Sequence, residues 1–89
     1  MKKLPPFEKL RSYLKENGKG FTLEREEMLK VILSMKGTYS AEDFYKAAFK
    51  KKAIHDRSTV YRGLSIFADA GFVEVSRLPN GRKDYETKH

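Results

Sequence analysis

An Asn-Gly pair, Asn80-Gly81, separates two extended runs near the end of the chain and limits how the preceding residues can fold. Asn-Gly between such runs is a strong signal for a β-hairpin, because both residues accept the positive φ angles of a tight turn. An isolated hairpin is only marginally stable in water. We therefore expect its apolar residues Phe72, Val75 and Tyr85 to pack against a core formed by the rest of the chain.

Four amphipathic segments precede the hairpin and can supply that core. Apolar spacing and capping residues predict helices over residues 6 to 17, from Thr22 to just before Gly37, from Ser40 to about Lys51, and over residues 56 to 70. The apolar positions expected on their packed sides are Phe7, Leu10, Leu14, Met28, Val31, Ile32, Met35, Phe44, Tyr45, Ala48, Phe49, Val60, Leu64 and Phe67. Helices followed by a hairpin indicate an α+β fold.

The ends of the last two helices carry clear local signals. The run Ser-Ala-Glu-Asp that begins at Ser40 is a capping-box pattern, and Asp56 is a suitable N-cap residue. Gly71 is well placed to end the fourth helix in a left-handed conformation. The short connector between these two helices predicts a helix-turn-helix, with the hairpin as its wing.

Size and charge restrict the function further. The 89 residues suffice for a single domain, and no cysteine is present for a disulfide, a thiol nucleophile or a cysteine-ligated zinc. Nineteen Lys and Arg against 12 Asp and Glu give a net charge of +7, which favours a polyanionic partner. We expect double-stranded DNA and no membrane, because no helix has the pattern of a basic amphipathic anchor. With neither a signal peptide nor an apolar spanning segment, a cytoplasmic location is expected.

The fourth helix, residues 56 to 70, is the expected recognition helix in the major groove. If its apolar stripe faces the core, the helical period directs a polar set outward: Arg57, Ser58, Tyr61, Arg62 and Ser65. Arginine bonds guanine or phosphate, serine bonds base edges or phosphate, and tyrosine offers a hydroxyl and a ring. An ordinary solvated helix face is the alternative interpretation.

Four motifs resemble the DNA-binding domain of the ferric uptake regulator family. They are TLER from Thr22, SAEDFY from Ser40, STVYRGLSIFADAGFVEV from Ser58 and PNGRKDYE from Pro79, in the family's order. The resemblance covers roughly residues 10 to 87. It implies a winged helix in a transcriptional regulator, typically a repressor, of metal homeostasis.

The resemblance also implies which residues contact DNA. They are Tyr61 and Arg62 as principal contacts, Ser58 and Thr59 beside them, Arg82 and Lys83 in the wing, and Lys19 before the second helix. Gly20 stands where many relatives carry a basic residue, so the minor-groove contact is displaced to Lys19 or lost. Arg57 and His55 occupy positions that are commonly apolar, which would add a phosphate contact at Arg57.

For metal, the resemblance implies only fragments of a site. Thr38 stands where a metal-binding histidine is common, Glu86 matches a family ligand, and His89 lies near where others would follow. Two ligands do not complete a site that needs three or four. We therefore expect no cofactor in this chain, and a divalent metal only with the family's second domain. We also expect a monomer, which would become a dimer when that domain or DNA joins two copies.

Two alternatives to DNA binding fit the same fold. A winged helix can serve as a protein-interaction module for an acidic partner, or bind RNA by its shape. Both stay open on the sequence alone. An enzyme is not expected, because the chain has no cysteine nucleophile and no phosphate-binding glycine loop.

Overall fold

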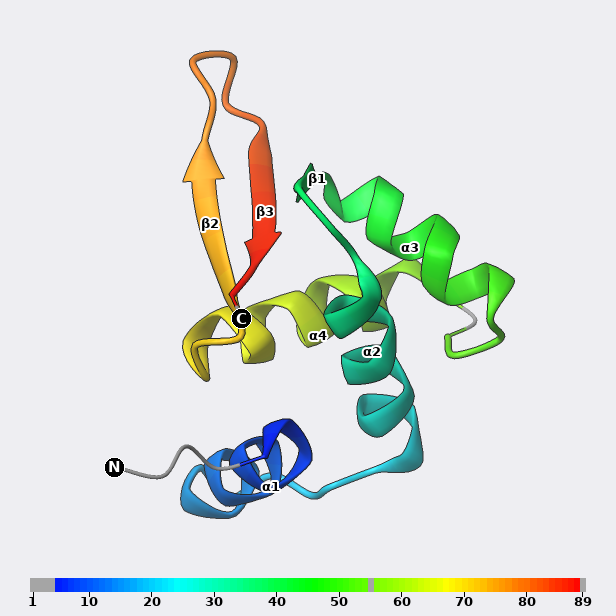
Figure 1. Ribbon diagram of the computed structural model, residues 1–89, viewed down its shortest axis with the longest axis vertical. Helices are drawn as coiled ribbons and strands as arrows, with labels where there is room; N and C mark the ends of the chain where they lie inside the picture. Colours follow the sequence, from blue (N-terminus) through cyan, green and yellow to red (C-terminus); the bar gives the residue numbers. More distant parts are fainter. Residues whose placement is uncertain (1–4, 55, 89) are drawn as a thin grey trace.

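The computed structural model describes residues 5–54 and 56–88, which form four helices and a small antiparallel sheet (Figure 1). The helices are α1 (Pro6–Glu16), α2 (Leu23–Ser34), α3 (Ala41–Lys50) and α4 (Arg57–Asp69). The strands are β1 (Thr38–Tyr39), β2 (Val73–Arg77) and β3 (Lys83–Thr87). The four predicted helices are confirmed, and their observed ends lie within one or two residues of the predicted ones.

Side-chain caps define where α2, α3 and α4 begin. The Thr22 hydroxyl accepts a hydrogen bond from the Arg25 amide at 3.1 Å, and the Asp56 carboxylate accepts one from the Thr59 amide at 2.8 Å. Such bonds satisfy amides that lack a partner in the first turn of a helix. After α4, Gly71 adopts a φ of +88°, as predicted for a residue that ends a helix.

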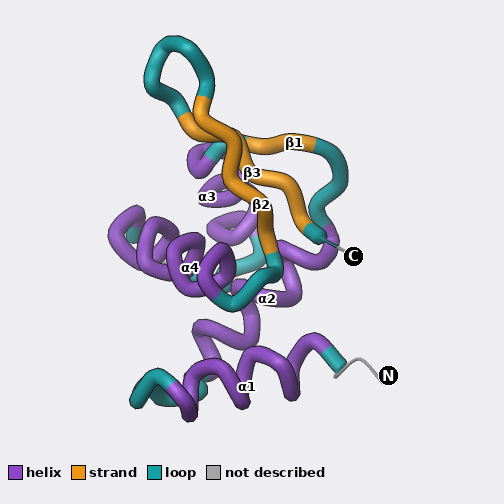
Figure 2. The backbone as a smooth tube through the Cα atoms, turned by 90° about the vertical axis from the view of Figure 1, so that its left-hand side faces the viewer, coloured by secondary structure: helices purple, strands orange, loops and turns teal. Residues whose placement is uncertain are grey.

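Helix α4 lies at the centre of the fold, between α1 on one side and the hairpin on the other (Figure 2). Its apolar stripe is buried as predicted: Val60 and Leu64 are 1% exposed and Phe67 is fully buried. The other large buried side chains come from α1, α2, α3 and the connector: Leu10, Leu14, Met28, Leu29, Val31, Ile32, Phe44 and Ile54. One core therefore holds all four helices together.

The sheet has three strands rather than the two expected, in the order β1-β3-β2. Strand β1 pairs with β3 through only two residues, Thr38 opposite Glu86 and Tyr39 opposite Tyr85. The Tyr39 hydroxyl lies 2.8 Å from the Thr87 hydroxyl, which donates to the Ile32 carbonyl at 2.8 Å. A two-residue strand has no alternating pattern to detect in the sequence, and its position is determined by these contacts.

Two apolar residues that were predicted to pack are exposed. Val75 is 39% exposed because the hairpin extends away from the helices (Figure 1), whereas Val73, on the same face at the start of β2, is buried in the core. Phe49 is 54% exposed in the last turn of α3 and lies beside Tyr45, with ring centroids 5.8 Å apart. Residues Phe44 and Ala48 form the buried stripe of α3, and Phe49 lies on its flank.

Candidate nucleic-acid interface

The outer face of α4 carries the side chains predicted to meet DNA. Ser58, Tyr61, Arg62 and Ser65 are exposed and Thr59 is partly buried. Tyr61 is 56% exposed, although it is one of the larger side chains of the helix. A phenol in this position offers both a ring and a hydroxyl to a partner.

Tyr61 lies on the side of α4 that faces the wing. With Arg82 and Lys83 of the hairpin it lines an open cleft, whose other lining residues include Tyr85 of β3 and Ser40 at the start of α3. Residues 78–82 form the tip of the hairpin, where the Gly81 amide donates to the Leu78 carbonyl at 2.9 Å. The fold thus brings one predicted contact on α4 and two on the wing to a single cleft.

Thr59 and Arg62 lie on the other side of α4, toward α2. They line a second, smaller cleft with residues that include Arg25 and Met28 of α2. Arg25 was not among the predicted contacts, although the sequence pattern around Thr22 contains it. Arg25 and Arg62 line the same cleft, so two guanidinium groups lie on this side of α4, one from α2 and one from α4 itself.

Arg25 also holds the loop that carries Lys19. Its guanidinium donates a hydrogen bond to the Gly20 carbonyl, and the guanidinium of Arg11 lies 4.5 Å from the centre of the Phe21 ring. Lys19 is exposed in this loop. The loop between α1 and α2 is therefore anchored at Gly20 and Phe21, directly after Lys19.

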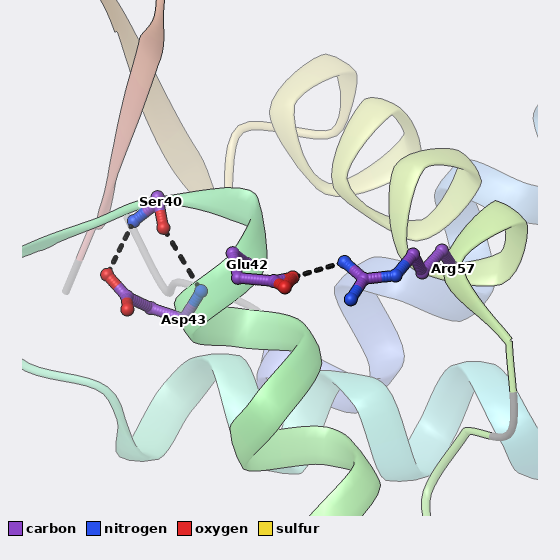
Figure 3. Close-up of polar contacts among 4 residues, drawn as sticks. All are labelled: Ser40, Glu42, Asp43 and Arg57. Carbon is purple, nitrogen blue, oxygen red and sulfur yellow. Dashed lines mark hydrogen bonds and ion pairs between the residues drawn. The ribbon is translucent and has the colours of Figure 1, made fainter.

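Arg57, at the start of α4, points toward α3 (Figure 3). Its guanidinium forms an ion pair with Glu42 and lies 4.5 Å from the centre of the Tyr45 ring. The hydrogen bond between Arg57 and Glu42 raises the pKa of Arg57 and lowers the pKa of Glu42. Arg57 was predicted as a phosphate contact, but in this structure its charge is already paired.

The comparison with known proteins decides the family. The model of the ferric uptake regulator family matches residues 16–89. The chain belongs to the ferric uptake regulator family. A ferric uptake regulation protein from Synechococcus elongatus is 33% identical over 79 residues, which cover 86% of this chain and 54% of that protein. This chain thus spans about half the length of the relatives it matches.

Solved structures of ferric uptake regulators confirm the predicted fold class. The regulator from Pseudomonas aeruginosa is 33% identical, with a TM-score of 0.69 over 86% of this chain and 58% of that chain. The regulator from Vibrio cholerae is 31% identical, with a TM-score of 0.68 over 89% of this chain and 61% of that chain. The α+β arrangement is therefore that of the family.

The candidate metal ligands that the structure describes do not come together in one site. In the part of the chain described here, no three His, Cys, Asp or Glu side chains gather closely enough to hold an ion. Glu86 is exposed on the outer face of the sheet, opposite Thr38 and Glu74, and neither a threonine nor a like-charged neighbour completes a site. His89 and His55 lie outside the described residues.

One further finding concerns membranes. Among residues 5–54 and 56–88, no helix combines the length and apolar character needed to cross a bilayer.

Proposed function

We propose that this chain is the DNA-binding domain of a metal-responsive transcriptional regulator and that α4 is its recognition helix. In this proposal α4 enters the major groove through its first turns, and the wing follows the adjacent backbone. Tyr61 and Arg62 are the principal contacts, with Ser58, Thr59 and Ser65 beside them. Arg82 and Lys83 of the wing bind phosphate, and Lys19 reaches the neighbouring groove.

The cleft between α4 and the wing carries this proposal. It joins Tyr61 of the helix to Arg82 and Lys83 of the hairpin, which are 20 residues or more away in sequence. Two cationic side chains beside an exposed phenol suit a phosphate backbone that runs next to a base edge. The family of the chain and its net charge of +7 support the same function and give no reason to propose an enzyme.

In this proposal the 89 residues bind DNA without a metal of their own. A divalent ion and stable dimerisation would then depend on further domains of the whole regulator. DNA itself could also bring two copies together on adjacent half-sites.

The class of partner is tested by measuring binding of the purified chain to three nucleic acids and one protein. We expect A·T-rich and mixed-sequence DNA duplexes to shift in an electrophoretic assay at concentrations where double-stranded RNA and an acidic protein do not bind. Preference for the RNA would support a shape-reading RNA binder. Binding only to the acidic protein would support a protein-interaction module.

The recognition helix is tested with Arg62→Ala. Because an exposed arginine in a base or phosphate contact contributes about 1 to 3 kcal/mol, its loss should weaken DNA binding by that amount without changing the circular dichroism spectrum. Lys30→Ala is the matched control, since Lys30 is exposed on α2 and lies on the side opposite Met28, which contacts α4. Equal binding by both variants and the parent would show that α4 is not the recognition helix.

A further inference from the structure

Glu42 is an acidic residue within a surface that is otherwise suited to phosphate. It lines the cleft with Tyr61 and Lys83, and its carboxylate pairs with the guanidinium of Arg57 (Figure 3). We propose that Glu42 competes with DNA phosphate for Arg57 and so lowers the sequence-independent affinity of this domain. This inference rests on the proposed DNA-binding function.

The position of Arg57 makes it a natural phosphate ligand. It is the first residue of α4, in the turn that points toward DNA in the proposed complex. A guanidinium forms paired hydrogen bonds with either a carboxylate or a phosphate, so the two anions compete for the same donors. In the structure Glu42 accepts one hydrogen bond from Nη1 of Arg57, and this ion pair offsets the positive charge that Arg57 would otherwise bring to the interface.

The contact with Tyr45 keeps Arg57 close to α3. The guanidinium carbon lies 4.5 Å from the ring centroid, a distance typical of a cation–π contact. Glu42 and Tyr45 are both on α3, separated by about one helical turn. The capping box of Ser40 and Asp43 orders the turn that carries Glu42, and together these contacts direct the carboxylate and the ring toward the start of α4.

The ion pair is exposed enough to exchange partners. The side chains of Arg57 and Glu42 are 59% and 40% exposed. Exposed ion pairs contribute little to folding stability, so opening this one should leave the fold intact. A phosphate can therefore displace the carboxylate, but Glu42 must then lose its partner and lie near another anion. Only DNA that gains compensating base contacts offsets this cost.

The experiment measures the binding of a mixed-sequence DNA duplex by fluorescence anisotropy over a range of salt concentrations. Glu42→Gln should bind more tightly than the parent at low salt. Its plot of log K against log salt should be steeper by about 0.9, because Arg57 becomes free to neutralise one more phosphate. A purely structural role for Glu42 would not change this slope.

Two control variants separate competition from simple charge repulsion. In the Arg57→Ala background, adding Glu42→Gln should leave the slope unchanged. Glu74→Gln removes the same charge from the outer face of the sheet, where Glu74 pairs with Glu86, and should match the parent. Circular dichroism and thermal unfolding would confirm that each variant is folded.

Each other result contradicts a specific part of the argument. An unchanged slope in Glu42→Gln overturns the inference alone. An increase that persists without Arg57 also overturns it, because it indicates repulsion from DNA by Glu42 itself. A parent chain that binds no duplex at low salt overturns the proposed function and, with it, the inference.

Discussion

At Gly63 the helix α4 is in close contact with the Met28 side chain of α2. A Cβ built at this position would lie 2.8 Å from the Met28 sulfur and 2.9 Å from its terminal methyl carbon. Met28 is only 2% exposed, and its thioether would have to move for a side chain at position 63 to fit. Glycine costs helix propensity relative to alanine, and we infer that close packing of α2 on α4 is the reason for it here.

Gly63→Val is therefore expected to destabilise the protein. Overpacking of a filled core typically lowers the free energy of unfolding by about 1 to 3 kcal/mol, and urea denaturation would measure this. Gly20→Val is the matched control, because no atom lies within 4 Å of a Cβ at Gly20. Its free energy of unfolding should stay within about 0.5 kcal/mol of the parent value. Equal stability of both variants would mean that α2 and α4 can move apart without loss.

At the scale of the element, α3 depends on its capping box. The Ser40 amide donates to the Asp43 carboxylate at 3.0 Å, and the Asp43 amide donates to the Ser40 hydroxyl at 3.1 Å (Figure 3). The hydrogen bond from the Ser40 amide, and after it the Ser40 side chain, lowers the pKa of the Asp43 carboxyl. The ionised carboxylate therefore stabilises the start of α3, next to Glu42, which forms the ion pair with Arg57.

The same shift predicts how stability depends on pH. A carboxyl whose pKa is lower in the folded state stabilises the fold fully above its unfolded pKa, near about 3.9 for aspartate. This stabilisation is lost as the pH falls through the pKa that the carboxyl has in the folded state. Asp43→Asn should therefore be less stable than the parent at pH 7, and the difference should narrow below about pH 4. Urea denaturation over a pH series would measure it, and a difference that stays constant down to pH 2 would contradict the assignment.

At the scale of the whole molecule, the described residues form one unit with extents of 36 × 30 × 23 Å. Helix α1 lies at the end opposite the hairpin tip (Figure 1) and is tied to the centre by a hydrogen bond from the Tyr13 hydroxyl to Asp69. Lys9 adds a contact 4.9 Å from the centre of the Phe72 ring. A single helix-turn-helix of this size can meet one DNA half-site.

We therefore expect the 89-residue chain to be a monomer that binds DNA with modest, strongly salt-dependent affinity. A single module buries about 600 to 1,000 Å² on DNA, so phosphate contacts must supply most of the binding. With roughly four to six phosphates neutralised, log K should fall against log salt with a slope of about −4 to −5. Sedimentation and a salt titration measure the two parts. A stable dimer without DNA contradicts the first, and salt-insensitive binding contradicts the second.

The sequence by itself determined the features that depend on neighbouring residues. Ser40 and Asp56 begin helices because their side chains bond amides three residues later, and Gly71 ends one because it accepts positive φ. The helical period alone separates buried Leu64 from exposed Arg62. Local signals of this kind do not require knowledge of the fold.

Tertiary structure decided the features that join distant segments. Strand β1 exists because β3 pairs with it, and Val75 is exposed because this part of the hairpin extends beyond the helices (Figure 1). Glycine is favoured at position 63 because the Met28 side chain of α2 packs against it. In the candidate interface, the helical period could direct Arg57 outward, but the position of α3 decides that Glu42 holds it. Residues 15 apart in sequence meet only through the packing of two helices, and no local pattern encodes that contact.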